Sequence, residues 1–162
     1  MLSDPAVLQR WLEEPSGATF LAVRELVLAD PSYNRYSQVF LRVSAPLKEG
    51  RHDKVRDVLM GEMPNLLLSP RAHMMLAVAY RHLGQKESEE MEGYLLGLCL
   101  QGIGESGDGS LERPYLVTRP EDEYDFLSSR QLERGSQELL KDGVDRLTAA
   151  DGTVMHFSFC RT

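Results

Sequence analysis

The side chains that could carry out chemistry are scattered along this chain. The candidates are four histidines and two cysteines: His52, His73, His82, His156, Cys99 and Cys160. The histidines form neither an H-E-x-x-H motif nor an i, i+4 pair, and the cysteines have no C-x-x-C spacing. The sequence therefore indicates no metal site, no cofactor and no catalytic residue, and it predicts two reduced, buried thiols. A hydrolase site assembled from distant residues, between helices and sheet, would show no motif and stays an alternative.

A glycine-rich turn is the segment most suggestive of a ligand site. It consists of Ser106, Gly107, Asp108 and Gly109. Exposed backbone N–H groups there could hold an anion, and Asp108 could bind a cation. The segment lacks the ligand spacing of a calcium loop and the lysine of a P-loop. Because glycine and aspartate are common turn residues, a structural turn is the favoured interpretation.

An acidic run follows this turn. Its carboxylates are Glu121, Asp122, Glu123 and Asp125. Consecutive residues point in different directions around a helix, so these side chains are not expected to converge on a metal or a substrate. They are expected to stabilise the N-terminus of their own short helix, with Tyr124, Phe126 and Leu127 on its buried side.

Apolar periodicity and turn residues predict the elements that position these groups. Helices are expected over about 5–12, 20–28, 33–49, 54–63, 70–83, 86–103 and 121–128, the last capped by Thr118. Residues 94–103 are apolar nearly all round and are expected to be buried. Strand-favouring residues at 115–118 and strands over 136–140, 145–149 and 153–159 predict a small antiparallel sheet, with Asp151-Gly152 as a hairpin turn.

Gly50 and Gly84 lie 34 residues apart, which is the period of the tetratricopeptide repeat. Leu76, Tyr80 and Gly84 resemble the first half of that repeat, whereas Glu89 and Gly93 depart from its second half. The sequence therefore predicts one domain, 1–162, that is mainly α and α+β overall. Its helical-repeat part would span 1–104 and its α+β cap 105–162.

A tetratricopeptide-like array would present a concave groove lined by the first helix of each unit. The expected lining residues are Ser37, Phe40, Ser44, Lys48, Arg71, Met74, Val78, Arg81 and His82. Three cations and several apolar side chains would suit an acidic or apolar peptide. The alternative, that the C-terminal part or the N-terminal helix pair fills this groove, stays open.

The C-terminal part resembles an uncharacterised bacterial domain-of-unknown-function family over about residues 94–159. The matching segments are Leu95–Leu98, Ser106–Gly109, Val117, Glu121–Tyr124, Gln137, Val144–Leu147, Gly152 and His156–Ser158. The resemblance implies a helical, tetratricopeptide-like front and the extent of the C-terminal module. It implies no activity for any residue.

Composition and charge narrow the function classes. The chain of 162 residues carries a formal net charge of −7, which disfavours binding to nucleic acid. No apolar run is long enough to cross a membrane, and no secretory signal begins the chain, so a cytoplasmic location is expected. The function hypotheses are a non-catalytic module that binds a protein or peptide, a structural domain that forms a homodimer, and a hydrolase.

Overall fold

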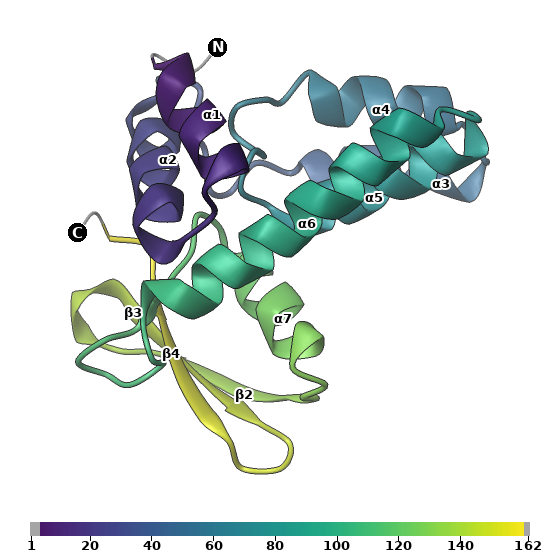
Figure 1. The fold of residues 1–162 in the computed structure, drawn as a ribbon. Coiled ribbons are helices and arrows are strands. Elements are labelled where there is room, and N and C mark those ends of the chain that lie inside the picture. The colour runs from purple at the N-terminus through teal and green to yellow at the C-terminus, as the bar shows by residue number, and fades with distance from the viewer. Residues whose placement is uncertain (1–3, 161–162) are drawn as a thin grey trace.

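Seven α-helices and a four-stranded sheet make up residues 4–160, the part of the chain that the computed structural model describes (Figure 1). The helices are α1 (Pro5–Glu13), α2 (Gly17–Ala29), α3 (Val39–Lys48), α4 (His52–Met60), α5 (Pro70–His82), α6 (Lys86–Ser106) and α7 (Pro120–Ser129). The strands are β1 (Tyr115–Leu116), β2 (Arg134–Leu139), β3 (Val144–Ala149) and β4 (Val154–Ser158), with a short 3-10 helix, Lys141–Gly143, before β3. The expectation of a mainly α chain with a C-terminal sheet is confirmed.

Capping residues and glycine turns delimit the helices much as predicted. Ser69 accepts a hydrogen bond from the backbone N–H of Ala72, and Pro70 occupies the first turn of α5, where its missing N–H costs nothing. Gly50 and Gly84 lie between α3 and α4 and between α5 and α6, with φ of 68° and 71°. This left-handed conformation favours glycine, which explains both turns. Whether these pairs are repeat units stays a prediction.

Two predicted helix starts were wrong. The third helix begins at Val39 instead of residue 33, because the preceding residues form turns in which Asn34 Oδ1 accepts from the N–H of Tyr36. Arg119 takes the cap position of α7 instead of Thr118. Thr118 still contributes, since its hydroxyl and its N–H both donate to Asp122.

The sheet is mixed, and the prediction of an antiparallel sheet is corrected accordingly. The strand order is β1-β4-β3-β2, with antiparallel β2–β3 and β3–β4 pairs and a parallel β1–β4 pair. The parallel pair arises because α7, β2 and β3 together form the long crossover between β1 and β4. Of the predicted strand residues 115–118, only Tyr115 and Leu116 form β1.

Buried apolar residues form two clusters. The larger cluster joins α1, α2, α6 and α7 to the inner face of the sheet, and the smaller one lies within α3, α4, α5 and the segment before α5. In Figure 1, α6 extends from the α3–α5 group to the sheet. The sheet therefore shares its core with the N-terminal helix pair through α6.

The contact of α2 with α6 depends on Gly102. A Cβ at this position would overlap the ring of Phe20 on α2, whereas a Cβ at Gly97 on the same helix would meet nothing within 4 Å. We expect Gly102→Ala to lower the free energy of unfolding by about 1–3 kcal/mol through overpacking. Gly97→Ala, the matched control, should raise it by about 0.5–1 kcal/mol, because alanine favours the helix. Urea denaturation measures both, and equal effects would contradict the packing role of Gly102.

None of the helices within residues 4–160 combines the length and the apolar character needed to cross a membrane.

Candidate binding cleft

The C-terminal part covers one end of the predicted groove. Phe40 on α3 lies between two guanidinium groups, Arg71 at 5.6 Å and Arg119 at 5.2 Å from its ring centroid. Arg71 pairs with Asp125 of α7 at 2.7 Å, and Arg119 donates to the carbonyl oxygen of Ser37. Residues of the C-terminal part therefore contact the Phe40–Arg71 end of the predicted groove, while the groove itself stays a prediction.

The remaining predicted groove residues do not form one positively charged strip. Arg81 pairs with Glu89 at 2.6 Å, and Ser44 donates to the carbonyl oxygen of Leu41. Lys48 is exposed and Val78 is half-buried. Because Arg71 and Arg81 are both neutralised within the chain, Lys48 is the only predicted groove cation for which no ion pair is found within residues 4–160.

A cleft between α5, α6 and α7 lies next to the Arg71–Asp125 ion pair. Its volume is 390 Å³, within the range of about 300–1,000 Å³ typical of ligand pockets. The lining residues are Pro70, Arg71, Met74, Leu96, Leu100, Asp125, Ser128 and Ser129. Arg71 and Met74 belong to the predicted groove, and the other six do not. The lining is mainly apolar, with one ion pair and two hydroxyl groups.

The polar groups of the cleft are largely satisfied within the chain. Both Nε and Nη2 of Arg71 donate to Asp125 Oδ1, at 3.2 and 2.7 Å. Burial raises the pKa of Asp125, although the hydrogen bonds from Arg71 act in the opposite direction. The hydroxyl of Ser129 donates to the carbonyl oxygen of Phe126. Within residues 4–160, Oδ2 of Asp125 is buried without a hydrogen-bond partner, so the cleft offers apolar surface and one unpaired carboxylate oxygen.

Leu96 and Leu100 were missed as cleft residues because residues 94–103 were expected to be wholly buried. In the structure only Leu98, Cys99, Gly102 and Ile103 of that stretch are buried, and Leu96 and Leu100 stay partly exposed. A regular alternation of apolar and polar residues at helical spacing would have indicated an exposed face, but residues 94–103 show no such pattern. Only the packing of α7 decides which face remains open.

The side chains of the acidic run point in different directions, as expected, and Glu123 meets a carboxyl group from outside the run. Glu123 on α7 and Asp145 on β3 are both buried and interact electrostatically. The side-chain amide of Gln137 on β2 donates to both, at 3.4 and 3.2 Å, and accepts from the hydroxyl of Tyr124. Burial, followed by the charge of Asp145, raises the pKa of Glu123 to about 9. Glu123 is therefore expected to keep its proton at neutral pH.

Asp122 closes the first turn of α7. Its Oδ2 accepts from the N–H and hydroxyl of Thr118 and from the N–H of Arg119, at 2.8 to 3.1 Å. Burial nevertheless raises the pKa of this carboxyl group to about 7. Asp122 thus caps its helix as expected, but from a fully buried position.

Two of the four histidines stack on each other, and a third is paired with a buried carboxylate. Nδ1 of buried His73 lies 2.6 Å from Oε2 of Glu92, and Nε2 lies 2.8 Å from the carbonyl oxygen of Leu67. The rings of His52 and His82 stack at 4.0 Å. Within residues 4–160, no three His, Cys, Asp or Glu side chains are placed to hold a metal ion. Glu92 is buried where it pairs with His73.

The glycine-rich turn uses its polar groups internally. The N–H groups of Asp108 and Gly109 both donate to the carbonyl oxygen of Arg113. The side chain of Asp108 accepts from the N–H of Ser110, and these hydrogen bonds hold the pKa of Asp108 below its usual value. The hydroxyl of Ser106 accepts from the N–H of Leu116. These contacts support the interpretation as a structural turn that positions β1.

The two cysteines differ in environment. Cys99 is buried, and burial raises the pKa of its thiol well above the usual value. Cys160 is exposed, because it follows the last strand beyond the sheet, and the prediction that both thiols are buried was wrong for it.

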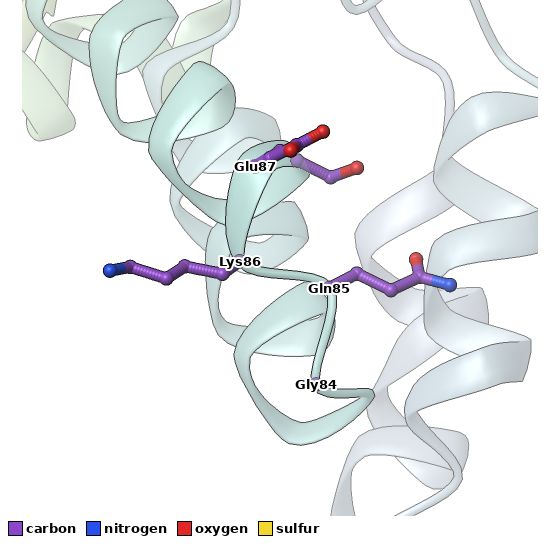
Figure 2. Close-up of a pocket in the computed structure, with 5 residues that line it drawn as sticks. Gly84, Gln85, Lys86 and Glu87 are labelled. Atoms are coloured by element: carbon purple, nitrogen blue, oxygen red, sulfur yellow. The ribbon is translucent and has the colours of Figure 1, made fainter.

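A second hollow lies at the turn between α5 and α6. Its volume is 440 Å³, and it is lined by five consecutive residues, 84–88. Figure 2 shows that the side chains of Gln85 and Lys86 extend to opposite sides of the chain. Because one turn alone forms this hollow and its side chains do not converge, the cleft between α5, α6 and α7 is the better candidate site.

Comparison with known proteins leaves the site to be judged from its geometry. No protein-family model matches this chain, and neither does any curated protein or solved structure. The resemblance of residues 94–159 to an uncharacterised bacterial family therefore stays a prediction.

Proposed function

We propose that this protein is a non-catalytic peptide-binding module whose binding site is the cleft between α5, α6 and α7. The observation that supports it is the open apolar lining, to which Pro70, Met74, Leu96 and Leu100 contribute from two helices. Met74 is 49% exposed, and methionine adapts its shape to different apolar ligands. A site for a peptide side chain needs such a concave apolar surface with few polar groups.

The preferred ligand is an apolar peptide segment, and the alternative of an acidic peptide is the weaker one. An acidic ligand would have to compete with Asp125 for Arg71 and with Glu89 for Arg81. Breaking the partly buried Arg71–Asp125 pair would leave Asp125 without its cation, which is costly. An apolar side chain would instead cover Met74, Leu96 and Leu100 without disturbing the pair.

The test is selection of peptides from a random display library on the intact chain, followed by fluorescence anisotropy with the selected peptides. We expect peptides with apolar anchor residues. Leu100→Lys should raise their Kd about 10- to 100-fold, since removal of an apolar hot spot costs about 1.4–3 kcal/mol. Leu47→Lys, at an exposed apolar residue on α3, should leave binding unchanged.

Two outcomes would contradict the proposal. One is selected peptides that bind Leu100→Lys as tightly as the intact chain. The other is selection of acidic peptides whose binding is lost in Lys48→Glu. That result would indicate that peptides bind in the predicted groove and not in the cleft. Circular dichroism of each variant confirms that a loss of binding is not a loss of fold.

A further inference from the structure

The outer edge of the sheet is an unpaired strand. β2 is the last strand in the order β1-β4-β3-β2, and all six of its residues are exposed. It contains no proline or lysine, and its edge-protecting features are the charged residues Arg134 and Glu138 and a register shift between Arg134 and Ser136. Leu139 near its end is 71% exposed, among the highest values for a large apolar residue in residues 4–160.

The hydrogen-bonding pattern shows which backbone groups of β2 face outward. The N–H of Leu140 donates to the carbonyl oxygen of Val144 at the start of the β2–β3 pair. Bonded pairs alternate in an antiparallel ladder, so Glu138 and Ser136 direct their N–H and C=O groups toward β3. The corresponding groups of Gln137 and Leu139 therefore point away from the sheet, along its free edge.

Only registers that bring outward-pointing residues together can join two copies of β2 antiparallel. A two-fold axis at Glu138 would place two Glu138 carboxylates opposite each other, which is unfavourable. An axis at Ser136 would leave Leu139 outside the pair. An axis at Gln137 places each Gln137 opposite its copy and each Glu138 opposite a Ser136, so that no like charges face each other.

Side-chain sizes also fit the register centred on Gln137. It places exposed Leu139 opposite Gly135, which has no side chain to obstruct it and lies at the register shift between Arg134 and Ser136 that ends the regular ladder. On the opposite face of the sheet, Glu138 keeps its ion pair with Arg146 on one side and gains the Ser136 hydroxyl on the other. We propose that the protein forms a two-fold homodimer in which β2 pairs antiparallel with β2 of a second copy, centred on Gln137.

The test is the mass in solution, measured by light scattering and by sedimentation over a range of concentrations. We expect a mass twice the 18.3 kDa of one chain at the upper concentrations. Leu139→Pro should abolish the dimer. It removes an outward N–H and an exposed side chain but no hydrogen bond to β3, and proline fits an edge strand in this position. The exchange Leu111→Ser, at another exposed leucine outside β2, is the control and should leave the dimer intact.

A gain-of-binding variant tests the register itself. Ser136→Lys would place an ammonium group opposite Glu138 of the second copy and should tighten the dimer several-fold at low salt. A chain that stays monomeric at every concentration would overturn the proposal, and so would a dimer that survives Leu139→Pro. A dimer that Ser136→Lys weakens would overturn the register centred on Gln137. Peptide binding in the cleft is measured separately and does not depend on these outcomes.

Discussion

Replacing Arg24 by methionine should lower the free energy of unfolding by about 2–5 kcal/mol, because each buried acceptor left unpaired costs about 1–3 kcal/mol. Arg24 on α2 is fully buried, and burial lowers the pKa of its guanidinium group. The side chain donates to the carbonyl oxygen of Val117, at 3.2 and 3.0 Å, and to that of Cys160, at 2.9 Å. Methionine fills a similar volume but leaves both acceptors unpaired. Since domains of this size are stable by only about 5–15 kcal/mol, the loss would be severe.

Urea denaturation followed by circular dichroism measures this loss. Arg10→Met is the matched control, because Arg10 on α1 is exposed and its ion pair with Glu14 should contribute less than about 1 kcal/mol. If Arg24→Met fails to fold, Arg24→Lys is the second variant. It keeps the positive charge but lacks the planar guanidinium donors, so it should lower the free energy of unfolding by an intermediate amount. Equal stability of Arg24→Met and the parent chain would mean that Arg24 does not hold β1 and β4 against α2.

The stability of the protein should fall as the pH rises from about 5 to about 9. The pKa of Glu123 is about 9 in the folded chain, against an ordinary value of 4.5, so the folded state keeps a proton that the unfolded state releases. Over this window the folded state binds more protons than the unfolded state on account of Glu123, so the free energy of unfolding falls as the pH rises. Asp122, with a pKa of about 7, acts in the same direction between about pH 4 and 7.

Glu123→Gln isolates the contribution of the buried carboxyl pair. The amide cannot ionise, but it can donate a hydrogen bond, as the protonated carboxyl group can. We expect the variant to resemble the parent chain near pH 5, to be more stable than it at pH 9, and to show a flatter slope between them. Urea titrations at several pH values measure this slope. Glu133→Gln makes the same change of charge at an exposed site and serves as the control. If Glu123→Gln left the slope unchanged, Glu123 would not hold its proton.

Local sequence signals predicted most of the helices because those signals act within a few residues. Ser69 and Pro70 start α5, and Gly50 and Gly84 end α3 and α5. The strands β3 and β4 lie close to their predicted positions because alternating residues flank a favoured turn at Asp151-Gly152. The start of α3 was misplaced because apolar residues continue the helical period through residues 33–38, where turn hydrogen bonds prevail.

The candidate site was much less predictable than the fold. Met74 and Arg71 were named as binding residues, but they line a cleft with Leu96, Leu100 and α7 instead of an open groove. The pairing of Arg71 with Asp125 joins residues that are 54 positions apart in the chain. No periodicity signals such a contact, since it depends on where α7 packs.

The sequence by itself determined the class of this protein, mainly α with a C-terminal sheet, because helix caps, turn glycines and apolar periods are local. Only the tertiary structure decided that buried Glu123 lies near Asp145, that two arginines contact Phe40, and that β1 runs parallel to β4. Each of these depends on residues brought together from distant segments. Burial raises the pKa of Glu123 and decides how accessible the cleft is. Because burial depends on packing between distant segments, it has no signal in the local sequence.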